Sequence, residues 1–297
     1  MARFLLFFSM QTELRQRLIT GLKDGAIVPC LGCDVLRDVV AAEGGQPIPA
    51  DDHSLIIAMN GGKPMSPRLM YEFSRAAMNV ELKRGRRAVD NFLTRAYGET
   101  TWTRASLHDW LGVIRPPYVL DLNRDTQLQE TYADRPHTLV VGVARIGGTD
   151  YRFRLFAFRE GAYAEIDPDA ARPALPILFK PVGTPRPRPH YVASDADYVD
   201  YITELMGGFA IPAFLKAYRK GRQYLLLGLP LDRDTERMLL ADILHDAATP
   251  VGWALVPPGR QIGAKERNFY KRLNLRIIAA DWAELLEDGE GSQGAGY

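Results

Sequence analysis

The spacing of apolar residues predicts helices and short strands that alternate along most of the chain. Helical spacing predicts a first helix from residue 12, with Thr12 as its N-cap and Gly21 or Gly25 at its end. The apolar run at 26–31 predicts a buried strand, although Pro29 has no backbone N–H to donate. Further strands are predicted at 118–120, 176–180, 224–227, 253–256 and 275–278, with helices at 197–206, 212–220, 234–246 and 265–273. This alternation indicates an α/β fold with a Rossmann-like, doubly wound, mostly parallel sheet.

Two segments interrupt that alternation. Helical spacing at 66–96 predicts a small helical insertion at about 64–112. A period of two at 137–166, with Gly147-Gly148 as a turn, predicts an antiparallel hairpin insertion at about 137–170. One domain at 10–286 that carries both insertions is the simplest organisation, and composition predicts a disordered tail at 287–297.

Neither the composition nor the net charge indicates a class of partner, so a partner must be recognised by a local site. The chain has 297 residues, of which 46% are hydrophobic and 25% charged, as is typical of soluble globular proteins. Its net charge of +1 favours neither nucleic acid nor a membrane as a partner. The apolar residues 1–10 precede no cleavage site, so we expect no targeting segment, with translation starting at Met1 or Met10. With only two cysteines, the chain is expected in the reducing cytoplasm.

Metal and redox chemistry find little support in the sequence. Cys30 and Cys33 form a C-x-x-C without a second pair, and we interpret both as small buried residues, with redox chemistry or half a metal site as the alternative. The five histidines lack ligand spacing, so no metal site is expected. The basic run at 83–87 is interpreted as a solvated face, with an acidic protein surface or a phosphate as its functional alternative.

Five segments occur in an order that resembles the sirtuin-like family. LKDGAIVPCLGCDVL at 22–36 is similar to the family's opening helix, strand and Gly-Ala-Gly-x-Ser turn, which receives NAD. LDLNRD at 120–125 resembles its Thr-x-Asn-x-Asp segment, and ILFKPVGT at 177–184 resembles the strand that ends in Lys-x-His-Gly-Ser. VASDADYVDYI at 192–202 and YLLLGLPLDRDTERMLL at 224–240 resemble the acidic Asp-Tyr stretch and the Leu-Gly-x-Ser-Leu-x-Asp strand with its helix. The resemblance implies a Rossmann-type domain whose cofactor is NAD or ADP-ribose.

The resemblance places the cofactor site at the ends of several strands. The residues that it implies for cofactor binding are Gly32, Cys33, Asp34, Asn123, Gly183 and Gly228. Glycines let backbone N–H groups approach a phosphate at a helix N-terminus, but Gly32 is the only glycine left in this turn, and Leu36 replaces the family's serine. A carboxylate at Asp34 would repel a pyrophosphate, so we expect Asp34 to cap the following helix instead.

Asn123 and Asp125 are the candidate catalytic residues. In the family the asparagine contacts the nicotinamide ribose and orients water, and the aspartate shapes the same pocket. Polar side chains at the carboxyl end of a parallel strand are well placed for a ligand. The alternative is that both residues only turn the chain and cap a helix after Leu122.

Val182 stands at the position of the family's catalytic histidine, which deprotonates a ribose hydroxyl. Valine has no proton to exchange, and no other base is adjacent, because Lys180 is expected to be protonated and His190 lies in a Pro-rich loop. Ordinary sirtuin deacylation is therefore not expected.

The segment that follows the strand at 224–227 also departs from the family. Pro230 replaces a serine that the family directs at NAD, which removes a hydroxyl and a backbone donor. Gly228, Asp232 and Asp234 match the family, but we interpret Gly228 as the end of the strand and Asp234 as a helix cap.

Three functions follow from this pattern. The leading hypothesis is a catalytically degenerate sirtuin-like protein that acts as a binding or regulatory module, with a nucleotide in the cleft near Asn123. The alternative is an NAD hydrolase that uses Asn123 and Asp125 with water. The third is a complex-forming protein whose two insertions carry the interface, and a protein partner is expected. The Lys-Pro-x-Gly-Thr variant at 180–184 links the chain to bacterial nitrogen fixation by association only.

Overall fold

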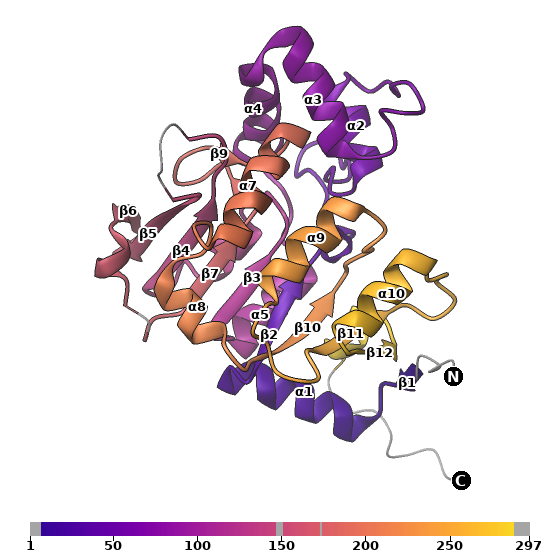
Figure 1. The fold of residues 1–297 in the computed structure, drawn as a ribbon, viewed down its shortest axis with the longest axis vertical. Coiled ribbons are helices and arrows are strands. Elements are labelled where there is room, and N and C mark those ends of the chain that lie inside the picture. The colour runs from indigo at the N-terminus through magenta and orange to yellow at the C-terminus, as the bar shows by residue number, and fades with distance from the viewer. Residues whose placement is uncertain (1–6, 147–150, 173, 288–297) are drawn as a thin grey trace.

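A ten-stranded sheet forms the centre of the protein (Figure 1). The computed structural model describes residues 7–146, 151–172 and 174–287. The strand order is β1-β12-β11-β10-β2-β3-β7-β4-β5-β6, and all pairs from β1 to β4 in this order are parallel. The strands are β1 (Phe7–Ser9), β2 (Ile27–Leu31), β3 (Tyr118–Asp121), β4 (His137–Gly142), β5 (Phe153–Arg159), β6 (Ala162–Ile166), β7 (Ile177–Lys180), β10 (Gln223–Leu227), β11 (Gly252–Val256) and β12 (Leu275–Ala279).

The order of the strands contains a switch point between β2 and β10. From β2 the chain moves to β3, β4 and β7 on one side of the sheet, and it later places β10, β11 and β12 on the other side. In an open parallel sheet such a switch leaves a crevice outside the carboxyl ends of the two strands, where ligands bind. The topology therefore predicts a ligand site at the carboxyl edge of β2 and β10.

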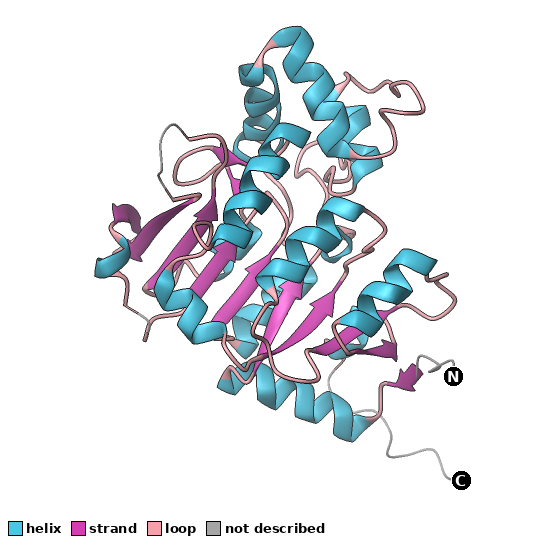
Figure 2. Ribbon diagram, viewed as in Figure 1, coloured by secondary structure: helices cyan, strands magenta, loops and turns pink. Residues whose placement is uncertain are grey.

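Helices cover both faces of the sheet, as a doubly wound fold requires (Figure 2). One face packs against α7 (Asp195–Gly207), α8 (Ala213–Arg219), α9 (Asp234–Ile243) and α10 (Ala264–Arg272). The other packs against α1 (Thr12–Asp24), α5 (Ser106–Ile114) and α6 (Gln127–Thr131). The predicted α/β, mostly parallel Rossmann-like fold is confirmed.

Strand β2 shows how the sequence fills both cores. Its five residues are all buried, with Ile27 and Leu31 in one hydrophobic core and Val28 and Cys30 in the other. Pro29 lies within this central strand, but the recorded pairing with β3 begins only at Cys30. The proline therefore costs the sheet little, because it precedes that ladder.

The helical insertion lies above the sheet in Figure 1. Its helices are α2 (Asp52–Met59), α3 (Phe73–Arg84) and α4 (Arg86–Thr94), followed by a π-helical turn at Arg95–Glu99. The helical spacing at 66–96 correctly predicted α3 and α4. Helix α2, which begins before the predicted insertion, was missed because its eight residues are too few to show a clear period.

The predicted hairpins are confirmed, since β5 pairs antiparallel with both β4 and β6. Strand β4 also pairs in parallel with β7, so the hairpins extend the main sheet. The turn at Gly147-Gly148 lies outside the described residues, as does the tail beyond residue 287. A two-stranded ribbon of β8 (Gly183–Thr184) and β9 (His190–Tyr191) follows β7.

The ends of the first helix agree only in part with the sequence. The helix ends at Gly25, whose φ of 76° is left-handed, as predicted. Its N-cap is Gln11, so the prediction of Thr12 was wrong: Gln11 is still extended and Thr12 is already helical. No helix in the described ranges is long and apolar enough to cross a membrane.

Candidate functional site

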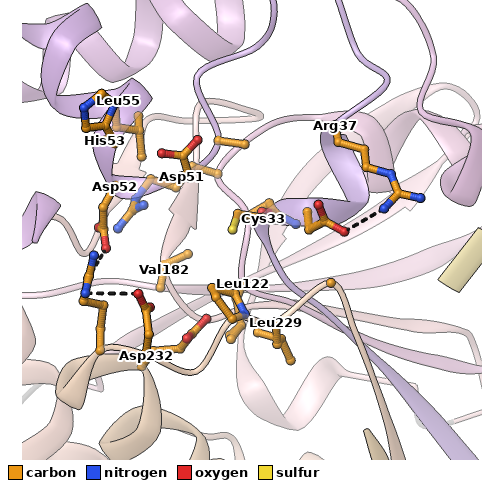
Figure 3. A pocket seen from close by; sticks show the side chains of 18 of the residues that line it. Cys33, Arg37, Asp51, Asp52, His53, Leu55, Leu122, Val182, Leu229 and Asp232 are labelled. Atoms are coloured by element: carbon orange, nitrogen blue, oxygen red, sulfur yellow. Dashed lines mark hydrogen bonds and ion pairs between the residues drawn. The ribbon is translucent and has the colours of Figure 1, made fainter. Parts of the chain in front are cut away.

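A cavity of about 520 Å³ lies at the carboxyl edge of the sheet, across the switch point (Figure 3). Its wall comes from the segments after β2, β3, β7, β10, β11 and β12, with α2 and α9 beside them. The residues labelled in Figure 3 are Cys33, Arg37, Asp51, Asp52, His53, Leu55, Leu122, Val182, Leu229 and Asp232. The wall is thus built where the topology predicts a site.

Gly32 and Gly228 allow the ends of β2 and β10 to approach each other closely. A Cβ atom at Gly32 would lie 2.5 Å from the Gly228 carbonyl oxygen. Gly228 has a φ of +65°, and a Cβ there would lie 2.7 Å from the Val35 backbone nitrogen. Gly228 borders the cavity, whereas Gly32 is buried behind it. The close contact between the two strand ends is therefore sufficient to explain why both positions are glycine.

The turn after β2 uses its own backbone donors. It forms a short 3₁₀ helix at Cys33–Leu36, in which Asp34 N–H donates to the Gly228 carbonyl at 3.0 Å and Val35 N–H donates to the Gly32 carbonyl at 3.3 Å. A phosphate-binding turn needs such groups free and aimed at the anion. The turn therefore does not fit a pyrophosphate in the manner that the resemblance implies.

Asp34 does not cap the helix, so that prediction was wrong. The N-cap is Gly32, and the Asp34 carboxylate instead accepts from the Trp282 indole at 3.0 Å and from Arg37 at 3.2 Å. Asp34 lines the cavity, and its carboxylate is held there by these two donors. Cys33 lines the cavity as a free thiol, and burial together with the nearby Glu236 carboxyl raises its pKa well above the usual value. A protonated thiol is a poor nucleophile.

Asn123 is held by a buried polar network at the end of β3. Its Nδ2 donates to Asp121 Oδ1 and to the Gly32 carbonyl, both at 3.0 Å. Asp121 also forms an ion pair with Lys180, and both of these side chains are fully buried. Asn123 lines the cavity with an Oδ1 that receives no hydrogen bond within the described residues. Asn123 is therefore rigid and presents one acceptor to a ligand.

Asp125 opens into a different space. It is 1% exposed and lines a second cavity of about 210 Å³, which Tyr97 also borders. Its Oδ1 accepts from Gln127 N–H at 2.8 Å and shapes the turn before α6, as the structural alternative expected. Its Oδ2 has no partner in the described chain, and burial raises the pKa of this carboxyl. Asn123 and Asp125 thus do not face one cavity.

Val182 is buried against the cavity at the position where the resemblance expects a histidine. The Lys180 ammonium is already paired with Asp121. His190 belongs to the two-stranded ribbon and does not line the cavity. Gly183 also belongs to the ribbon: its φ is +93°, and a Cβ there would clash with the His190 carbonyl. Neither Lys180 nor His190 therefore supplies a general base to the cavity beside Val182.

The segment after β10 is held by arginines. Pro230 lines the cavity, and its carbonyl accepts from Arg260. Asp232 forms an ion pair with Arg233 at 3.0 Å. Asp234 does not cap α9, contrary to the prediction, because the N-cap is Arg233 and the Asp234 carboxylate pairs with Arg237 and Lys265.

Arg124 is a cavity residue that the sequence reasoning missed. It is 9% exposed, its Nη2 donates to the Val192 carbonyl at 2.7 Å and to the Tyr198 hydroxyl at 3.2 Å, and its buried Nε has no partner. No carboxylate of the described chain forms an ion pair with it. The other guanidiniums that line the cavity, those of Arg37, Arg233 and Arg260, all pair with carboxylates. Its place directly after Asn123, at a strand end, was an available signal.

Glu236 is the second residue that was missed. It lies in the first turn of α9, where its Oε2 accepts from Leu231 N–H at 2.8 Å. Burial, followed by the charges of Asp232 and Asp52, raises the pKa of Glu236 to about 8. The side chain therefore holds a proton at neutral pH, a property that the sequence alone does not reveal.

The remaining sequence features lie outside this cavity. Cys30 is fully buried, as predicted. In the basic run, Lys83, Arg84 and Arg87 are exposed, as a solvated face requires, but Arg86 pairs with Asp90 and the buried Asp197. The described residues contain no group of side chains that could hold a metal ion.

The protein is thus a Rossmann-like α/β protein with a cavity at its switch point. No known protein-family model matches the chain, and a search of curated proteins found no relative. The chemistry of the cavity is therefore the guide to function.

Proposed function

We propose that this protein is a sirtuin-like binding module, without deacylase activity, whose cavity binds a small ligand through an anionic group on Arg124. The observation that carries the proposal is the lack of a counter-ion for this guanidinium. Arg124 is almost fully buried at the cavity wall, whereas the neighbouring guanidiniums are neutralised by carboxylates.

The Arg124 guanidinium is desolvated without a counter-ion among the described residues. Such a charge is costly, and the hydrogen bonds to a carbonyl and a hydroxyl and the Phe73 ring, whose centroid lies 5.3 Å from the guanidinium carbon, compensate only part of that cost. Arginine binds carboxylates and phosphates through two parallel N–H groups. On Arg124, which lines the cavity, Nη1 makes no hydrogen bond to the described residues, which leaves a donor for such a ligand.

NAD and ADP-ribose are the first ligands to test, because the resemblance to sirtuin-like proteins implies them. Their phosphates would lie on Arg124, since the Asp34 and Val35 backbone donors of the turn after β2 are already used. The absence of deacylation rests on Val182, because a general base contributes roughly 10²–10⁴-fold to such a step.

The test is a thermal melt with millimolar NAD or ADP-ribose. A ligand present at about 100 times its Kd stabilises the folded protein by about 2.7 kcal/mol, which is a clear upward shift. We expect this shift in the wild type and its loss in Arg124→Gln. Arg37→Gln is the matched control, because Arg37 lines the same cavity but already pairs with Asp34 and Asp281, so its shift should persist.

The same samples distinguish the alternative, NAD hydrolysis. Asn123 Oδ1 faces the cavity and favours this alternative, whereas the placement of Asp125 in the second cavity disfavours it. Nicotinamide release by the wild type but not by Asn123→Ala would establish the hydrolase and overturn the proposal of a non-enzymatic module. Absence of any ligand-induced shift would overturn binding altogether.

A further inference from the structure

Two ionisable groups of opposite kind in the cavity wall, a guanidinium and a carboxyl, have no counter-ion among the described residues. Arg124 is a buried guanidinium without a carboxylate. Glu236 is a half-buried carboxyl group on α9 that no Lys, Arg or His of the described chain neutralises. Its nearest basic neighbour, Arg237, instead pairs with Asp234 and donates to the Leu231 carbonyl.

These two groups face the same space without pairing with each other. Both line the cavity of about 520 Å³, yet no ion pair joins them. Tyr198, which also lines the cavity, accepts from Arg124 and is influenced by the charges of Arg124, Asp52 and Glu236. Arg124 and Glu236 are therefore close enough to act on one small molecule.

The surroundings of Glu236 favour a positive charge beside it. The carboxylates of Asp52 and Asp232 face it from α2 and from the segment before α9, and the protonated Cys33 thiol faces it from the turn after β2. Arg233 neutralises Asp52 and Asp232 in part, and the Leu231 N–H and Arg237 favour the ionised form of Glu236. An approaching ammonium group would meet two carboxylates there, those of Asp52 and Asp232, which share the single guanidinium of Arg233.

We infer that the cavity takes a zwitterionic small molecule, whose carboxylate or phosphate lies on Arg124 and whose protonated amine lies on Glu236. This inference rests on the proposed function, because it keeps the contact between an anionic group and Arg124 and adds a second contact on Glu236. The amine brings its own proton, so Glu236 must release the proton that it holds near neutral pH, and that proton leaves to the solvent. Binding at pH 7 is therefore accompanied by release of close to one proton per ligand.

Isothermal titration calorimetry tests this inference with probes of defined charge. The complete probes are γ-aminobutyrate and O-phosphoethanolamine, which differ in their anionic group. The half probes are butyrate, inorganic phosphate and ethanolamine. Titrations are made at pH 7 in cacodylate and in imidazole buffer, which differ in ionisation enthalpy. The difference between the two observed binding heats gives the number of protons released to the buffer. We expect at least one complete probe to bind tenfold or more tightly than its halves, and we expect it to release a proton.

Two variants assign the contacts. Glu236→Gln should abolish proton release and weaken the complete probe at least tenfold, while leaving the anionic half probe unaffected. The variant is expected to fold, because the Gln oxygen can still accept from Leu231 N–H. Arg124→Gln should weaken the complete and the anionic probes together. Asp242→Asn, on the same helix but outside the cavity, is the matched control and should change neither quantity.

The outcomes separate this inference from the proposed function. Binding of ADP-ribose that depends on Arg124, with no preference for complete over half probes, would overturn the inference and leave the proposed function intact. Proton release that persists in Glu236→Gln would also overturn the inference. Absence of binding by every probe and nucleotide would overturn both.

Discussion

Two regions of the carboxyl edge face the same cavity but offer a ligand very different chemistry. At the ends of β2 and β10, Gly32 and Gly228 press together and the turn amides bond within the protein. At the end of β3, Asn123 and Arg124 keep an acceptor and a donor unused. Close packing of two strands therefore removed the backbone site that the resemblance implies, whereas side chains after the neighbouring strand remain open.

The largest expected effect comes from the network that supports the β3 region. Lys180→Met should destabilise the protein by about 3–5 kcal/mol, because it leaves Asp121 as a fully buried, unpaired carboxylate. Urea denaturation measures the change. Arg115→Gln, which breaks the exposed pair with Asp134, is the control and should cost under about 1 kcal/mol. A loss of similar size in both variants would contradict the supporting role of Lys180.

A smaller effect is expected at the region of β2 and β10. Gly61→Ala should cost about 1–2 kcal/mol, because Gly61 has a φ of +68° but nothing near a new Cβ. Gly228 has a similar φ, so Gly228→Ala should carry the same backbone cost. The clash of its new Cβ with Val35 should add roughly 1–3 kcal/mol to that cost. Equal losses in the two variants, measured by urea denaturation, would show that strand contact does not require Gly228.

A third effect concerns the dependence of stability on pH. The pKa of Glu236 is raised to about 8 in the folded protein, so its protonated form stabilises the fold at low pH. This contribution is complete below the pKa of an unfolded glutamate and is lost as the pH rises through about 8. The free energy of unfolding should therefore fall more between pH 5 and pH 8.5 in the wild type than in Glu236→Gln. Parallel profiles would contradict the raised pKa.

Much of the fold could be predicted from the sequence, because the periods of apolar residues differ between helices and strands. The hairpins, the parallel strands and the helices after them follow that signal. The N-caps expected at Thr12, Asp34 and Asp234 were wrong, because each of these residues already lies inside its helix. The carboxylates of Asp34 and Asp234 pair with arginines instead.

The site could be predicted only in part. Of the six residues that the resemblance implies for cofactor binding, Cys33, Asp34, Asn123 and Gly228 line the cavity and Gly32 and Gly183 do not, and their binding of a cofactor stays a prediction. Asp125 is only two residues from Asn123 but faces another cavity, because the chain turns between them. The importance of Arg124 and Glu236 depends on the partners that they lack in three dimensions, which no local pattern encodes. The expected protein partner, cytoplasmic location and link to nitrogen fixation stay predictions.

The central claim is that Arg124 binds the anionic group of a ligand, and the NMR signal of its side chain tests this most directly. The Nε–H group is buried and unpartnered, so its signal can be assigned by its disappearance in Arg124→Gln. With ADP-ribose, or with O-phosphoethanolamine as the smaller probe, we expect the chemical shift of this signal to change and to saturate as ligand is added. The Kd from this titration should agree with the Kd from the thermal stabilisation. A ligand that stabilises the protein while the Arg124 signal stays in place would contradict the account.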